Sequence, residues 1–222
     1  MSKVEKQQVP KIRFNQFNDN WLNKSFADCF DIQNGYAYKS SNFVDKKTGK
    51  IVLTPGSIAL GGGYQADKGR NYSLEAEIPE NFIFKSGDIF ITLTDLTPSA
   101  QALGYPAIVP ADDNLYLHNQ RLGKIINSKL EEMFLYNLLR RDHYHRYIVS
   151  TASGTTVKHS SATAVLSYET RMPEINEQVK IGNFFQQLDK LIELQTRAVE
   201  SAESYKKAML QKMFPQKGEK VP

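Results

Sequence analysis

The stretch MPEINEQVKIGNFFQQLDKLIELQ, residues 172–195, begins a run in which apolar side chains recur every three or four positions as far as Phe214. This period predicts a single amphipathic helix from about 176 to 213, and at ~1.5 Å per residue that helix would be roughly 57 Å long. A domain made of the ~170 residues before it has a radius of gyration of only about 15 Å. We therefore expect the helix to extend beyond its own domain and to pack against something else.

Heptad positions a, d and e along this run form one apolar seam when Ile181 is placed at position a. Five such heptads are typical of a helix that pairs in a coiled coil, although the first two heptads could instead pack on the domain. Gln195 and several alanines thin the seam toward its C-terminal half, so we expect specific rather than strong pairing. The predicted interface residues are Ile181, Phe184, Phe185, Leu188, Leu191, Ile192, Val199, Ala202, Tyr205 and Met209.

The residues before the helix have the pattern of a β-rich domain. Short β-branched or aromatic segments bounded by Gly, Pro or Asp occur at 51–55, 81–95 and 104–110, and they predict strands. Gly87-Asp88 predicts a tight turn between two strands. Residues 61–73 contain four glycines and predict a polar loop.

A further helix is predicted within 128–150, where Ser128 and Glu131 form a capping-box pattern and apolar residues again recur at helical spacing. Residues 152–173 return to small and β-branched side chains. The expected fold class is therefore α+β: a β-rich mixed domain followed by one long coiled-coil-forming α-helix. Its expected parts are an N-terminal arm at 1–24, the β-rich domain at 25–174, the long helix at 175–214 and a tail at 215–222.

Composition is typical of a globular protein from a reducing compartment. With 222 residues, 41% of them hydrophobic, the chain can bury a sizeable core. Its sequence has no apolar run long enough to span a membrane, no signal-peptide pattern at its start, and one cysteine, Cys29, which cannot form an internal disulfide. We expect a cytoplasmic protein with no membrane partner. The net charge of +4 permits a nucleic acid or an acidic protein as partner.

Patterns for catalysis and metal binding are weak. His143 and His145 are two residues apart, so on a helix they would point in different directions and would not share a metal. No Gly-x-Gly-x-x-Gly motif occurs, so no dinucleotide or S-adenosylmethionine loop is predicted. A loose nuclease pattern can be drawn through Asp31 and Asp45-Lys46-Lys47, but a solvated loop explains it better. We therefore predict no catalytic residue, metal ligand or cofactor in this chain.

Three clusters of polar and cationic residues suit nucleic-acid recognition better. They lie in the glycine-rich loop, around Gln120, and in the segment SGTTVKH at 153–159. Lys and Arg can neutralise phosphates, Gln and Arg can make bidentate contacts to base edges, and Gly154 would let backbone amides approach a phosphate. The candidate DNA-binding residues are Tyr64, Gln65, Lys68, Arg70, Gln120, Arg121, Thr155, Thr156, Lys158 and His159.

The chain resembles a known family over essentially its whole length. The segments PKIRFNQFNDNW at 10–21, GDIFITLTDLTPSAQALGYPAIVP at 87–110 and LHNQRLGKI at 117–125 are similar to the recognition domain of a type I restriction–modification specificity subunit. The most specific part is the join P-x-I-x-E-Q with the helix pattern FF-x-x-LD-x-x-I, both within 173–192. LQKMFP at 210–215 resembles the usual end of the family's helix.

This resemblance implies a non-catalytic targeting subunit. A family member has two halves, and each recognition domain reads one part of a split DNA sequence. The helices of the two halves run antiparallel as a spacer and dock the methyltransferase (modification) subunits. The resemblance further implies that S-adenosylmethionine, ATP and Mg²⁺ act in partner subunits, namely the modification subunit and, where one exists, a restriction subunit.

The sequence corresponds to a single half of such a subunit. Its end, QKGEKVP at 216–222, resembles KQQVP at 6–10, so we expect the chain to end where a second half would begin. The long helix would then pair with a second copy of the chain about a two-fold axis, or with a different half. Two other functions stay open: a stand-alone metal-dependent nuclease, and a coiled-coil adaptor that does not bind DNA.

Overall fold

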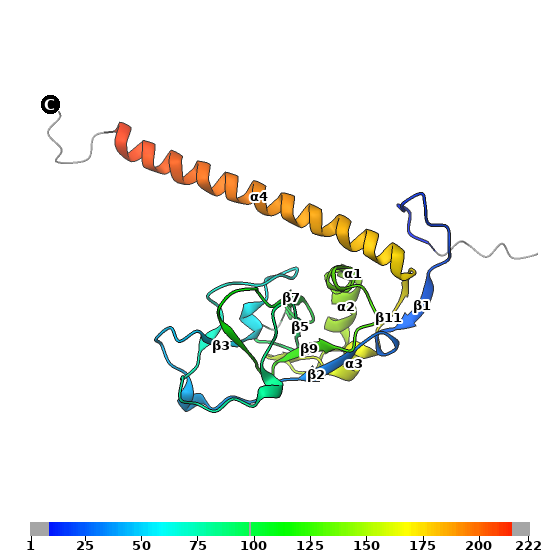
Figure 1. Cartoon of the computed structure of the whole chain (residues 1–222), viewed down its shortest axis with the longest axis horizontal. Coiled ribbons are helices and arrows are strands. Elements are labelled where there is room, and N and C mark those ends of the chain that lie inside the picture. Colours follow the sequence, from blue (N-terminus) through cyan, green and yellow to red (C-terminus); the bar gives the residue numbers. More distant parts are fainter. Residues whose placement is uncertain (1–8, 98, 215–222) are drawn as a thin grey trace, which may run out of the picture.

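The computed structural model describes residues 9–97 and 99–214, so the predicted tail at 215–222 and the start of the predicted arm lie outside the described residues. The described part has the expected α+β fold: a domain of mixed sheets with three short helices, followed by one long helix (Figure 1). Strand β1 (Leu22–Ser25) pairs with β11 (Glu169–Met172). This pairing crosses the expected boundary of the arm and ties the start of the domain to its end.

Four strands form the central antiparallel sheet of the domain, in the order β2-β9-β5-β7. They are β2 (Asp31–Asn34), β9 (Leu122–Ile126), β5 (Ile89–Thr92) and β7 (Pro106–Ile108). All of β5 is buried, because its alternating side chains face two hydrophobic clusters: Ile89 and Ile91 face one, and Phe90 faces the other.

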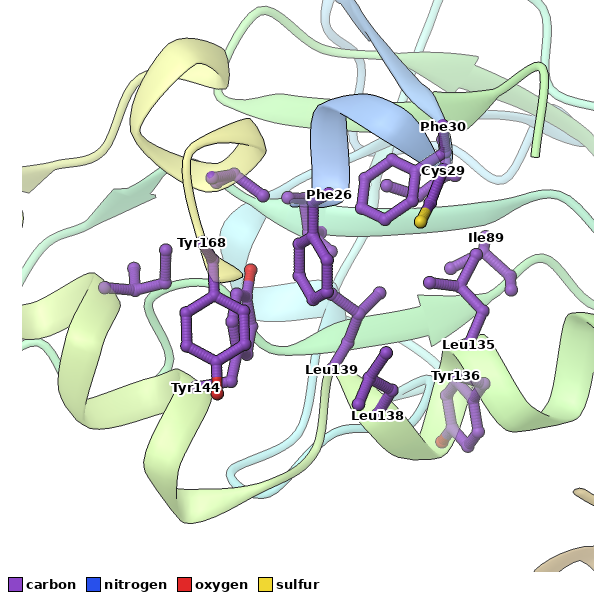
Figure 2. Close-up of a cluster of buried hydrophobic side chains, with 14 of the residues drawn as sticks. Phe26, Cys29, Phe30, Ile89, Leu135, Tyr136, Leu138, Leu139, Tyr144 and Tyr168 are labelled. Carbon is purple, nitrogen blue, oxygen red and sulfur yellow. The ribbon is translucent and has the colours of Figure 1, made fainter. Parts of the chain in front are cut away.

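The larger hydrophobic cluster holds three helices on this sheet. These are α1 (Glu132–Leu138), α2 (Asp142–Thr151) and α3 (Ala162–Leu166). Phe26 lies within the cluster, with its ring centroid 5.6 Å from that of Tyr144 and 5.0 Å from that of Tyr168 (Figure 2). Burying each such aromatic side chain stabilises the fold by about 1.5–3 kcal/mol. The cluster thereby fixes the position of α1, on which the long helix rests.

A smaller sheet has the order β4-β3-β8. It consists of β4 (Arg70–Asn71), β3 (Lys50–Leu53) and β8 (Leu115–His118). Because β3 runs parallel to β8 and antiparallel to β4, the ends of β3 and β8 meet the start of β4 at one edge. Two short strands, β6 (Thr94–Asp95) and β10 (Lys158–His159), pair with each other beside the sheets.

Two local predictions are wrong. The first concerns 128–150, which forms two helices instead of one, with residues 139–141 between α1 and α2. The N-cap of α1 is Glu131 and not Ser128, because the Glu131 carboxylate accepts the Phe134 N–H at 2.6 Å. A carboxylate at this position also interacts favourably with the positive end of the helix dipole.

The second wrong prediction concerns the segment 81–95. The turn at Gly87-Asp88 is present, and Gly87 has φ +85°, a conformation that glycine adopts without strain. The turn does not join a hairpin, however. The Phe84 N–H before it donates to Tyr116, whereas β5 after it pairs with β7 and β9.

Helix α4 (Ile175–Met213) is the long helix that the sequence predicts, and its 39 residues extend over about 58 Å. It contacts α1 near its own start and then extends over and past the domain (Figure 1). Its buried residues are Glu177, Gln178 and Gly182. A Cβ on Gly182 would lie 2.9 Å from the Phe134 nitrogen, so α4 and α1 touch at this glycine.

Most predicted interface residues of α4 face solvent. Within the first two heptads, Ile181 packs on the core of its own domain, whereas Phe184 and Leu188 stay 46% and 38% exposed. Met209 is partly buried. The other predicted interface residues are exposed, namely Phe185, Leu191, Ile192, Val199, Ala202 and Tyr205.

No helix in residues 9–97 or 99–214 combines the length and apolar character that crossing a membrane requires.

Candidate nucleic-acid interface

Two of the three predicted clusters come together around strand β6. The N–H of Leu93, just before β6, donates to the Arg121 carbonyl at 2.8 Å, and the Leu93 carbonyl accepts the Ser160 N–H at 2.9 Å. β6 itself pairs with β10, which belongs to the loop 153–160. The turn 119–121 and the loop 153–160 therefore flank the same short strand.

The third cluster, in loop 61–70, approaches from the smaller sheet. Thr54, which follows β3, donates its hydroxyl hydrogen to the Lys68 carbonyl at 3.1 Å. The last residues of β3 and β8 are opposite each other. Adjacent strands are about 4.8 Å apart, so the start of β4 and the end of β8 lie roughly 10 Å apart across β3. The fold thus gathers three segments that are distant in sequence along one edge of the domain.

The candidate side chains differ in how freely they face solvent. Two are engaged within the protein: the Arg70 guanidinium lies 3.9 Å from the centroid of the Phe43 ring, and the Tyr64 hydroxyl donates to that of Tyr116 at 3.4 Å. Gln65 and Lys158 are partly buried. His159 is exposed, with its Nδ1 3.1 Å from the Thr94 hydroxyl. The other exposed candidates are Lys68, Gln120, Arg121, Thr155 and Thr156.

The backbone of loop 153–160 closes on itself. Ser153 and His159 exchange two N–H···O bonds of 2.9 Å. Gly154 has φ +92°, and a Cβ on it would collide with the carbonyl oxygen of Val157. The glycine is therefore needed to close the loop. The two threonines that follow it are left exposed at the tip.

His118 is a buried polar residue for which the sequence predicts no role. It is 1% exposed, and its Nε2 lies 3.0 Å from the Leu122 carbonyl, which identifies Nε2 as the donor. Burial lowers the pKa of His118 to about 4, so the imidazole is neutral near pH 7. Because His118 directly precedes the turn 119–121, its packing helps to position that turn. The apolar residues around it in LYLHN are the available sequence signal.

The acidic residues of the loose nuclease pattern lie apart. Asp31 begins β2 and accepts a hydrogen bond from Asn127 at 2.9 Å, whereas Asp45 lines a hollow of about 400 Å³ on the smaller sheet. His143 and His145 also bond separately, one to a tyrosine hydroxyl and one to a backbone carbonyl. In the part of the chain that the structure describes, no three His, Cys, Asp or Glu side chains are grouped to hold a metal.

A buried carboxylate anchors the long helix to the arm. Arg13 donates through Nε and Nη2 to the two oxygens of Glu177, at 2.7 Å each, and Trp21 Nε1 donates to the same carboxylate at 3.2 Å. Gln178 beside it bonds to the backbone of the α1 N-cap residue and of Pro173. These contacts set the direction in which α4 leaves the domain. In the sequence, this Glu-Gln pair is noticeable only as part of the family resemblance at 173–178.

A groove of about 550 Å³ lies between the arm, α1 and the first turns of α4. Its apolar lining includes Pro10, Trp21, Phe134, Leu138, Ile181 and Phe185. Arg140 and Asp189, which form an ion pair at 2.5 Å, also line it. Through Phe185 the groove is continuous with the exposed apolar face of α4.

Comparison with known proteins gives a consistent result. The chain is 27% identical over 177 residues to the type I restriction enzyme EcoBI specificity subunit of Escherichia coli, covering 79% of this chain and 33% of that protein. Its fold is similar to that of the type I restriction–modification S subunit from M. genitalium, with a TM-score of 0.61 at 18% identity, covering 88% of this chain and 46% of the other.

The HsdS subunit from Thermoanaerobacter tengcongensis has a TM-score of 0.54 to this chain at 14% identity, covering 86% of this chain and 42% of the other. The chain therefore spans a third of the curated relative and less than half of each solved relative. The family model for the type I restriction modification DNA specificity domain matches residues 18–203, from just before β1 into the second half of α4. The chain belongs to the type I restriction modification DNA specificity domain family.

Proposed function

We propose that this chain reads one half of a bipartite DNA sequence and that α4 connects it to the rest of a restriction–modification complex. Membership of the specificity-domain family supports DNA sequence recognition. The observation that carries the finer proposal is the edge shared by loop 61–70, turn 119–121 and loop 153–160. These segments are far apart in sequence, polar and cationic, and most of their candidate side chains are exposed.

Two kinds of contact would then bind the DNA, one to phosphates and one to base edges. Lys68, Arg121 and Lys158 would neutralise phosphates, which holds the register on the duplex and makes binding sensitive to salt. Gln65 and Gln120 would contact base edges, where each good bidentate pair contributes about 1–3 kcal/mol of discrimination. The closed backbone of loop 153–160 favours binding to DNA, because a preformed loop loses little entropy on binding.

Helix α4 would act as the spacer and the docking element. Its apolar face is exposed beyond the contact with α1, and such a face is suited to pairing with the helix of another half. A second copy of this chain, antiparallel about a two-fold axis, would give an interrupted palindrome as the DNA site. A different half would give a site with two unlike parts.

The chemistry itself would belong to other subunits. Methyl transfer to adenine, with the base flipped out of the duplex, would take place in a modification subunit that binds S-adenosylmethionine. ATP and Mg²⁺ would serve a restriction subunit where one is present. In this scheme the chain contributes targeting and is not itself an enzyme.

The test is a methylome. The chain is expressed with its cognate modification subunit, both without and with a second specificity half from the same source, in a host that lacks adenine methylation, and the genome is sequenced by a method that detects methylated bases. We expect methylated adenines in one split motif. A palindromic motif indicates a two-fold pair of this chain, and an asymmetric one indicates a different second half. A genome without new methylation contradicts the proposal.

A further inference from the structure

Arg140 is one side chain that contacts both the first candidate DNA-binding loop and the long helix. Its Nε donates to the Gly61 carbonyl at 3.1 Å, and its Nη1 donates to the Asp189 carboxylate at 2.5 Å. The same Nη1 donates to the Asn137 side-chain oxygen at 3.2 Å, and the guanidinium lies 5.1 Å from the centroid of the Tyr136 ring. The planar guanidinium is therefore fixed in orientation at the end of α1.

The glycines at the start of loop 61–70 fit closely around this side chain. Gly62 has φ +96°, and a Cβ on it would lie 2.8 Å from the Arg140 Cγ and 3.2 Å from the Pro106 carbonyl oxygen. The Gly63 N–H donates to that same carbonyl at 2.8 Å. Successive glycines thus allow the loop to lie directly on Arg140 and on β7, which gives the GGG run a packing role that the sequence did not reveal.

We propose that Arg140 is a positioning residue that sets the placement of loop 61–70 relative to α4, and so couples base preference to half-site spacing. The proposal rests on the proposed function, in which this loop reads DNA and this helix is the spacer. Arg140 touches no DNA in this scheme. It acts through Gly61 on one side and Asp189 on the other, and its fork geometry is what allows both contacts at once.

The two contacts can be separated by substitution. Asp189→Asn removes the ion pair with α4 and leaves the contact with Gly61, so it should broaden the accepted spacing and keep the base preference. Arg140→Lys keeps a positive charge beside Asp189 but lacks the fork, so it should relax the base preference more than the spacing. Arg140→Met removes both contacts, so it should broaden the accepted spacing and also relax the base preference. Arg141→Met is the matched control, because this neighbouring arginine donates instead to Thr170, at 3.3 Å.

The experiment measures methylomes of the wild-type chain and the four variants, each expressed with its modification subunit. Methylation is compared at sites with one altered base and at sites whose spacer is one base pair longer or shorter. We expect Arg140→Met to raise methylation at both kinds of altered site by about fivefold or more relative to the intact motif, as losing one base-edge contact would. Arg141→Met should leave the ratios unchanged. Melting temperatures identify any variant that fails to fold. If Arg140→Met fails to fold, Asp189→Asn still tests the contact with α4.

The outcomes separate this inference from the function on which it rests. If the wild-type chain directs methylation to a split motif and the Arg140 variants lower it equally at all sites, Arg140 is only structural and the inference is overturned. If the variants match the wild type, it is overturned as well. If the wild-type chain directs no methylation at any motif, the proposed function itself is rejected.

Discussion

Two buried polar side chains, His118 and Glu177, are stabilised in opposite ways. His118 is held in its uncharged form inside aromatic surroundings, with the Phe84 ring centroid 4.6 Å from its own. Glu177 is 2% exposed but lies against the guanidinium of Arg13. The stability of the protein should therefore respond to pH through His118 and to loss of the neighbouring cation through Glu177.

His118 should make stability depend on pH. Because its folded-state pKa is about 4 and its ordinary value is 6.5, the unfolded chain binds a proton between these values that the folded chain does not. Its contribution is complete above about pH 6.5 and is lost as pH falls toward 4, by on the order of 3 kcal/mol. Urea unfolding at several pH values should show a shallower acid-side slope for His118→Gln than for the wild type. His159→Gln, at an exposed site, is the control, and equal slopes for all three proteins would contradict the assignment.

Arg13→Met should be strongly destabilising, because it leaves the Glu177 carboxylate buried without its cation. Breaking a buried pair in this way typically costs about 3–5 kcal/mol, whereas replacing both partners by apolar residues costs much less. A double-mutant cycle with Glu177→Met, measured by urea denaturation, should therefore show strong non-additivity. The exposed pair of Arg197 and Glu193, 2.6 Å apart, is the reference, and its coupling should be only a few tenths of a kcal/mol. Similar coupling in the two pairs would show that Glu177 is not effectively buried.

At the scale of elements, the edge that holds the candidate DNA-binding residues consists of a turn and two loops carried by strands. Loop 153–160 is tied to β6, and turn 119–121 joins β8 to β9 in two different sheets. Loops placed in this way can vary in side chain without disturbing the strands. The base preference and the stability of the domain should therefore respond to different substitutions.

Lys158 and Gln120 should have distinguishable effects on DNA binding. Lys158→Ala should weaken binding to all sequences alike and reduce the slope of log K against log salt by about one, since it removes one phosphate contact. Gln120→Ala, and likewise Gln65→Ala, should relax the choice at particular base pairs. Fluorescence anisotropy on a panel of duplexes over a salt series measures both effects, with Lys190→Ala on α4 as the control. If Lys158→Ala leaves affinity unchanged across the series, loop 153–160 does not contact phosphates.

At the scale of the whole molecule, the main feature is a helix much longer than its contact with the domain. Contacts with the rest of the chain are concentrated at the start of α4, around Glu177, Gly182 and Asp189. The remainder exposes an apolar face that includes Leu191, Ile192 and Val199. Exposed apolar faces of this length are characteristic of surfaces that another chain covers.

A single charge on this face should prevent pairing without unfolding the domain. Leu191 is 57% exposed and lies at heptad position d, so Leu191→Glu would place a carboxylate in the seam of a paired helix. We expect light scattering to show a mass about twice that of the chain for the wild type and a monomer for the variant, with equal melting temperatures for the recognition domain. Gln186→Glu, on the outward side of the helix, is the control. Equal masses for wild type and Leu191→Glu would exclude self-association through this face.

The sequence determined the features whose causes are local. The apolar period alone predicted α4, because residues three and four apart share a helix face whatever the rest of the chain does. Short β-branched segments likewise indicated β3, β5 and β7, and the resemblance indicated the family. Local patterns failed at the start of α1, where the capping-box pattern placed the N-cap at Ser128 and the helix begins instead after Glu131.

Only the tertiary structure decided which candidate residues share a site. Strand pairing brings loop 61–70, turn 119–121 and loop 153–160 to one edge, and no local pattern encodes a hydrogen bond between segments so distant in sequence. The same is true of Arg70, which stacks on Phe43, and of Arg140, which joins a loop to a helix about 50 residues further on. Periodicity reports which face of an element is buried, whereas the packing of whole elements determines what that face meets.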